Sequence, residues 1–353
     1  MATKDAVLLA GHGSRRNESN RQVRDVAERL ESRLGDPVKP AFIELEEPLL
    51  HDGIDALAET ADSITVVPLT LFAAGHVKND IPLVVHHARE QHPSVTLDYG
   101  SHLGVRPEMV DIVADRIEAI ESTMAVDPTA DDVAVVFCAR GSSDPDANAE
   151  ACRLARFVYE GRDFTRVEPT FIGITEPLLD RTLSELAAHD PDGIVVVPYM
   201  LGDGVLTRRV EEMVASFDED HPGIEAATAD VLGIDDRLID VLEDRVQEAR
   251  RGEVSMSCDT CKYKVTLDGF EDEVGGEQAF VDSLEHTLAH VRGGHDHDHS
   301  HGDHEHGHSE ADHDHSHGDH GHGPSDEQGH CHGHDHAHSD DEHGHSHGDD
   351  HSH

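Results

Sequence analysis

Tryptophan is absent from this 353-residue chain, cysteine occurs five times, and no apolar run has the length of a membrane span. The N-terminus lacks the basic and then apolar pattern of a signal peptide. An odd number of cysteines without framework spacing favours a reducing compartment over a disulfide-stabilised secreted domain. We therefore expect a cytoplasmic protein with no membrane partner.

Positive charge is also scarce, since 27 Lys and Arg face 74 Asp and Glu, for a formal net charge of −47. Residues 1–294 alone hold 58 acidic side chains against 27 basic ones, so the C-terminal tail is not the only source. Without a basic patch to meet phosphates, we exclude nucleic acid as a partner. The acidic, lysine-poor composition favours a halophilic protein over compositional drift, because salt screens the repulsion between carboxylates.

Strand-like and helix-like segments alternate in the first part of the chain. Apolar runs of strand length lie at residues 6–9, 40–45, 64–71 and 95–99, and amphipathic stretches of helical length lie at 18–34, 49–60, 80–91 and 107–120. This alternation predicts a parallel sheet with right-handed crossovers. The same pattern begins again at residue 133, after a polar linker.

An internal repeat relates the two parts. Gly-His-Gly-Ser at residues 11–14 corresponds to Ala-Arg-Gly-Ser at 139–142, an offset of 128. The run FIELEEPLL at residues 42–50 corresponds to FIGITEPLL at 171–179, an offset of 129. A period of this length indicates two whole domains rather than a solenoid.

Three chemically active side chains occur in the first repeat only. They are two imidazoles and a carboxylate, His12, Glu44 and His76, and their counterparts are Arg140, Gly173 and Val205. All three lie at or just beyond the end of an expected strand, so they can converge at one edge of the sheet. Such groups suit Co²⁺, Ni²⁺, Fe²⁺ or Zn²⁺ and can also accept protons. We predict a catalytic metal site here; the alternative is three ordinary loop residues.

The stretches at residues 8–14, 42–48 and 68–82 resemble the signature segments of the class II tetrapyrrole chelatases. The chain is most similar to the long, two-domain CbiX-type sirohydrochlorin cobaltochelatases. This resemblance implies a bilobal chelatase-like fold of two tandem parallel-sheet α/β domains from an internal duplication. It also implies ATP-independent insertion of Co²⁺ into sirohydrochlorin, or a precorrin relative, for cobalamin biosynthesis. His12 and His76 would then bind the metal and accept pyrrole protons, and Glu44 would assist as ligand or base.

The predicted organisation has four parts. These are a chelatase-like first lobe with the active site (residues 1–126), a degenerate second lobe (127–250), a small segment containing a C-x-x-C motif (251–294) and a disordered His/Asp-rich metal-binding tail (295–353). In the second lobe, we expect Arg140 and Arg208 or Arg209 to face carboxylates of the macrocycle, since arginine pairs well with carboxylate.

The C-terminal third adds two candidate metal-binding features. The spacing of Cys258 and Cys261 is typical of half of a zinc or iron–sulfur site or of a redox pair, and the alternative is that the two cysteines have no special role. Cys331, tail histidines or the other subunit of a homodimer would complete such a site. The tail holds 22 of the 33 histidines and too little apolar surface to fold. Its imidazoles and carboxylates favour a divalent-metal reservoir or delivery arm over a merely solvated tail.

Other functions remain open at this point. A sirohydrochlorin ferrochelatase or nickelochelatase would use the same residues, although the tail favours cobalt or nickel over iron. A metal-storage protein or metallochaperone would act through the tail instead. Such a protein has no need for His12, Glu44 and His76 in one repeat only, so the enzyme is the leading hypothesis.

Overall fold

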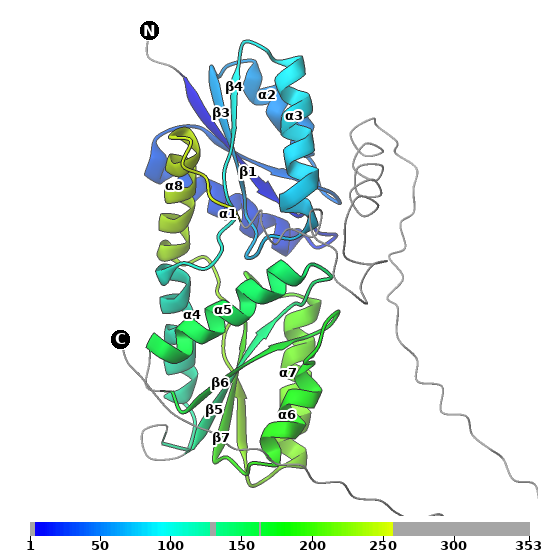
Figure 1. Cartoon of the computed structure of the whole chain (residues 1–353), viewed down its shortest axis with the longest axis vertical. Coiled ribbons are helices and arrows are strands. Elements are labelled where there is room, and N and C mark those ends of the chain that lie inside the picture. The colour runs from blue at the N-terminus through cyan, green and yellow to red at the C-terminus, as the bar shows by residue number, and fades with distance from the viewer. Residues whose placement is uncertain (1–3, 128–131, 162–163, 257–353) are drawn as a thin grey trace, which may run out of the picture. The chain divides into compact units, whose positions relative to one another are not determined.

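The computed structural model describes residues 4–127, 132–161 and 164–256 (Figure 1). It contains two four-stranded, wholly parallel sheets, with strand orders β2-β1-β3-β4 and β6-β5-β7-β8. The first sheet consists of β1 (Asp5–Gly11), β2 (Val38–Phe42), β3 (Ser63–Pro68) and β4 (Thr96–Tyr99). The second consists of β5 (Val133–Ala139), β6 (Arg166–Phe171), β7 (Gly193–Pro198) and β8 (Glu225–Thr228). The predicted pair of parallel-sheet α/β domains is therefore confirmed.

Helices connect the strands in the same order in both lobes. The first lobe contains α1 (Asn17–Leu34), α2 (Leu50–Ala58), the π-helical turn η1 (His76–Asp80), α3 (Ile81–Gln91) and α4 (Pro107–Glu121). The second contains α5 (Pro145–Gly161), α6 (Leu179–Ala187), α7 (Val205–Asp220) and α8 (Asp236–Arg250). None of these described helices has the length and hydropathy of a membrane span.

The central strand β1 is buried on both faces, as is typical of a parallel sheet covered by helices. Leu8 and Ala10 face a core that includes residues of α2 and α3. Val7 and Leu9 point to the opposite face, because successive side chains of a strand alternate. They belong to a second core, which also contains residues of α1 and α8. This explains why β1 reads as one continuous apolar run.

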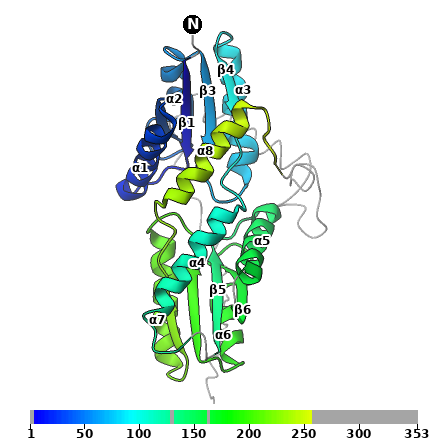
Figure 2. The same cartoon turned by 90° about the vertical axis from the view of Figure 1, so that its left-hand side faces the viewer.

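The last helix of each repeat packs on the sheet of the other repeat. Helix α8 contacts β3 and β4 beside α1, whereas α4 contacts β7 beside α5 (Figure 2). One hydrophobic core consequently includes Leu9 of β1, Ile112 of α4, Phe137 of β5 and Leu242 of α8. The two α/β domains therefore share a hydrophobic core through these exchanged helices.

Three elements differ from the sequence-based prediction. Strand β3 ends at Pro68 rather than at residue 71. Strand β2 ends at Phe42 rather than at residue 45, so Glu44 lies in the following loop. The reason is the backbone of Leu45, whose φ of +62° is left-handed and incompatible with an extended strand. The helix expected to begin at residue 80 is preceded by η1, which begins at His76. A π-helical turn directly before an α-helix is a feature often found at functional sites.

Candidate metal site at the edge of the first sheet

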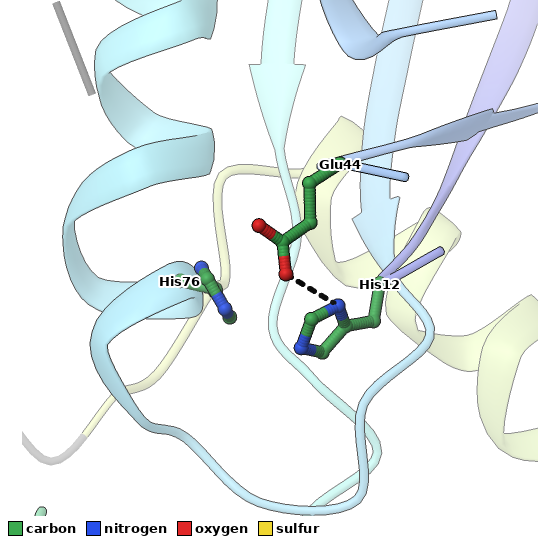
Figure 3. A group of neighbouring side chains, drawn as sticks. All are labelled: His12, Glu44 and His76. Carbon is green, nitrogen blue, oxygen red and sulfur yellow. Dashed lines mark ion pairs between the residues drawn. The ribbon is translucent and has the colours of Figure 1, made fainter. Parts of the chain in front are cut away.

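His12, Glu44 and His76 lie on three segments that leave neighbouring parallel strands. His12 directly follows β1, Glu44 lies two residues beyond β2, and His76 opens η1 after β3. Because parallel strands end at the same edge of a sheet, the topology brings the three segments together. Figure 3 shows the Glu44 carboxylate next to both imidazole rings, whose centroids lie 4.8 Å apart. The structure therefore juxtaposes the three side chains that the repeat comparison singled out.

Gly13 allows the first two segments to approach closely. Its φ is +94°, and a Cβ atom at this position would lie 1.7 Å from the carbonyl oxygen of Glu44. The Glu44 N–H donates a hydrogen bond to the His12 carbonyl oxygen at 3.1 Å. The second lobe repeats this packing at Gly141, where a Cβ would lie 2.0 Å from the Gly173 carbonyl oxygen. The glycine therefore serves the fold of both lobes.

The distances within the cluster suit one shared ion. One ligand atom from each side chain can be chosen so that all three lie within 4.8 Å of one another. Ligands bound at about 2.1 Å to one ion lie at most about 4.2 Å apart, so small side-chain movements suffice for common coordination. Among the described residues, no second group of three potential metal ligands comes this close together. Three protein ligands leave coordination positions free for a substrate.

Asp80 orients the His76 ring. Its carboxylate oxygen Oδ2 lies 2.5 Å from His76 Nδ1, and the Asp80 side chain is only 14% exposed. A carboxylate at Nδ1 favours the tautomer that carries its proton there, which leaves Nε2 free to bind a metal. Sequence reasoning missed Asp80, although its spacing of four residues from His76 on a helical stretch was the available signal.

The surroundings of His12 favour its neutral form. Burial, and then the charge of nearby His76, lower the pKa of His12, and the opposing charge of Glu44 does not compensate. Glu44 Oε1 lies 3.6 Å from His12 Nδ1, beyond direct hydrogen-bond distance. Within the described residues, this nitrogen has no hydrogen-bond partner. A neutral imidazole with a free lone pair is the form that binds metals.

The counterparts in the second lobe do not form such a site. Arg140 is exposed at the end of β5, and its charge is a further influence that lowers the pKa of His12. Val205, the counterpart of His76, is 62% exposed at the start of α7. The predicted metal ligands Cys258 and Cys261, together with Cys331 and the histidine-rich tail, lie outside the described residues and stay predictions.

Comparisons with known proteins place this geometry in context. The family model CbiX matches residues 6–120 and again residues 134–249. The chain is 35% identical over 263 residues to the sirohydrochlorin cobaltochelatase of Priestia megaterium, which covers 74% of this chain and 85% of that protein. It is 31% identical over 223 residues to the sirohydrochlorin ferrochelatase of Bacillus subtilis (strain 168), which covers 63% of this chain and 83% of the relative.

The fold is also similar to that of a solved structure, SirB from Bacillus subtilis with Fe³⁺. The TM-score is 0.63 at 30% sequence identity, over 71% of this chain and 97% of the other. The similarity thus extends through both lobes, and the named relatives include both cobalt and iron enzymes.

Proposed function

This chain belongs to the CbiX family, and we propose that it inserts Co²⁺ into sirohydrochlorin, or a precorrin relative, for cobalamin biosynthesis. The observation that carries this proposal is the convergence of His12, Glu44 and His76 in one lobe only. The relative named sirohydrochlorin cobaltochelatase supports the choice of substrate and metal. No step of the reaction requires a nucleotide.

Metal insertion exchanges two pyrrole N–H protons for one divalent cation. In the proposed reaction, His12 and His76 bind the incoming ion through neutral imidazole nitrogens and replace part of its hydration shell. The ion retains open positions, which the pyrrole nitrogens occupy as the protein ligands release it. Glu44, whose carboxylate lies beside both rings, accepts a released proton, and the histidines accept protons once the ion has left them.

The macrocycle requires apolar contact and recognition of its carboxylates. Leu45, directly after Glu44, is 51% exposed although it is a large apolar residue. Its left-handed backbone recurs at the counterpart Ile174 in the second lobe (φ +71°, 65% exposed), so the conformation belongs to the fold of both lobes, and the assignment depends on the exposed side chain beside Glu44. We assign Leu45 to contact with the face of the tetrapyrrole. Arg140, exposed and close enough to influence His12, would pair with a substrate carboxylate.

Cobalt is proposed over iron and nickel on two grounds. One is the cobaltochelatase of Priestia megaterium, and the other is the composition of the tail, whose many imidazoles suit cobalt or nickel better than Fe²⁺. The test is anaerobic insertion into sirohydrochlorin with Co²⁺, Ni²⁺ and Fe²⁺ offered singly and in competition, followed by absorbance. His12→Ala and His76→Ala should each abolish most of the activity. Faster insertion of Fe²⁺ than of Co²⁺ would assign the enzyme to sirohaem synthesis instead.

The tail is proposed to supply metal to the site. It holds 22 histidines after residue 294, which gives many weak sites for a divalent cation. A chain terminated before His295 should retain turnover at saturating Co²⁺ and lose rate only when the metal is scarce. A metal-storage or metallochaperone function predicts the opposite result, in which the truncated chain is inert and the His12→Ala variant of the full chain still works.

A further inference from the structure

Helix α5 of the second lobe contacts the part of the first lobe that carries His76. We propose that this helix positions His76, because its carboxylates hold residues 71–78, which we call the His76 segment. This inference rests on the proposed function, since that function gives His76 its role in metal binding. It also gives the second lobe, which lacks metal ligands of its own, a part in the chemistry of the first.

Glu150 of α5 makes the contact on the N-terminal side of His76. One of its carboxylate oxygens accepts a hydrogen bond from the Ala73 N–H at 3.0 Å. The two oxygens also lie 2.9 and 3.0 Å from His102 Nε2. Arg245 of α8 in turn donates to the His102 carbonyl oxygen at 2.8 Å. With side-chain exposures of 7% for His102 and 15% for Glu150, this contact is shielded from competing water.

Lys78 makes the contact on the C-terminal side. Its Nζ atom lies 2.9 Å from Asp144 Oδ2 and 3.0 Å from Asp146 Oδ2. The three side chains are 8%, 1% and 9% exposed, so the ion pairs are buried. Separating them would leave uncompensated charges in the interior, which fixes their arrangement. His76 therefore lies between two attachments to the second lobe, one through the Ala73 backbone N–H and the other through the Lys78 side chain.

The repeat provides an internal comparison for these contacts. Gln22 of α1, the counterpart of Glu150, donates to the Leu201 carbonyl oxygen at 2.9 Å. This contact also links the two lobes, but here a neutral amide donates to a backbone carbonyl oxygen, whereas the Glu150 carboxylate accepts from a backbone N–H. Thr207, the counterpart of Lys78, instead bonds Gly204 within its own helix. In the described part of the chain, the buried ion pairs of Lys78 have no counterpart at Thr207.

The comparison extends to all the anchoring residues. Each anchoring residue has a counterpart in the other repeat. The pairs are Asp144 and Arg16, Asp146 and Glu18, Glu150 and Gln22, Lys78 and Thr207, and His102 and Val231. Packing of the two lobes alone does not require the charged set, since the Gln22 contact is made without it. Precise positioning of His76 does require these charged contacts, because a displacement of about 1 Å at a reacting group can cost about a hundredfold in rate.

The test compares Glu150→Ala with Gln22→Ala, its structural counterpart, in the full-length chain. Glu150→Ala should lower kcat for Co²⁺ insertion at least about tenfold and change KM for the tetrapyrrole much less. Glu150→Gln keeps an oxygen for the Ala73 N–H and should recover most of the loss. Gln22→Ala should leave kcat within about threefold of the wild type, since the segment it contacts carries no metal ligand.

Two further measurements separate positioning from general destabilisation. In a His76→Ala background, Glu150→Ala should have no additional effect on residual insertion, because its influence passes through the missing ring. Hydrogen exchange at residues 73–78 should be about tenfold faster in Glu150→Ala, with residues 199–206 unchanged. This measurement needs no catalysis, so it tests the attachment even if sirohydrochlorin is not the substrate. Full additivity with His76→Ala, or equal effects of Glu150→Ala and Gln22→Ala, would overturn the proposal.

Discussion

His76 and Asp80 stand at opposite ends of the π-helical turn η1, with the Asp80 carboxylate 2.5 Å from His76 Nδ1. A π-helical turn with this contact aligns the ring before the regular helix α3 begins. The carboxylate also fixes the tautomer of the ring, so that Nε2 is presented to a metal. Asp80 should therefore matter to metal binding although it does not itself belong to the cluster of three.

Asp80→Asn is expected to weaken metal capture by His76. Loss of such a carboxylate partner typically costs about 10–100-fold in metal affinity or activity. The measurement is the apparent KM for Co²⁺ during insertion, with free metal fixed by a buffer. Glu90→Gln is a matched control, because His86 and Glu90 have the same spacing but lie 3.9 Å apart with both side chains 69% exposed. An unchanged KM for Co²⁺ in Asp80→Asn would refute this role.

Gly13→Ala should destroy activity, since the added Cβ would lie 1.7 Å from the Glu44 carbonyl oxygen and must displace the loop. Gly141→Ala introduces the equivalent clash, 2.0 Å from the Gly173 carbonyl oxygen, in the lobe without the site. Both variants should lose about 1–3 kcal/mol of stability. Chemical denaturation measures the loss of stability in each variant, and insertion assays measure the loss of activity, so the two effects can be compared. Comparable loss of kcat in both variants would contradict the assignment of the site to the first lobe.

Leu45→Gly should weaken tetrapyrrole binding and raise the stability of the fold. Glycine adopts φ of +62° without a steric penalty, so the free energy of unfolding should rise by up to about 1 kcal/mol. Loss of the exposed side chain should raise KM for the tetrapyrrole several-fold. Phe157→Ser is the control, because Phe157 is similarly exposed, at 48%, on the surface of α5. A Leu45→Gly variant with unchanged KM would show that Leu45 does not touch the macrocycle.

The ion pair of Asp235 and Arg237 predicts a stability change in acid. The Arg237 hydrogen bond holds the pKa of Asp235 at about 2, below its ordinary value, despite partial burial. Stability from the ionised carboxylate is therefore complete above about pH 4 and is lost as the pH falls toward 2. Asp235→Asn retains the helix cap and removes the charge. It should be less stable than the wild type by about 1 kcal/mol at pH 7, and denaturant titrations should show this difference shrinking below pH 4.

The parallel sheets could be predicted from the sequence, because the apolar runs and their alternation with helical segments are visible in the sequence itself. It also predicted that His12, Glu44 and His76 lie close together, because the second repeat acts as a control in which folding residues persist. The end of β2 was placed too late, since nothing local reveals that Leu45 adopts a left-handed backbone.

The contacts between the two repeats could not be predicted from the sequence. Glu150 reads as one more acid on the solvated face of a helix, yet it accepts a hydrogen bond from Ala73, 77 residues away. Arg245 likewise resembles an ordinary surface arginine, although it donates to the His102 carbonyl oxygen, 143 residues away. Such long-range partners depend on which helix covers which sheet, and periodicity within one helix does not encode that.

The exchange of α4 and α8 constrains how this chain can evolve. Each half completes the apolar interior of the other, so a deletion that removes the half without the three candidate metal ligands would also expose the core of the half that carries them. One copy can therefore lose its candidate metal ligands by mutation, whereas α4 and α8 must be kept because each covers the sheet of the other copy. Duplication followed by such mutual dependence is hard to reverse.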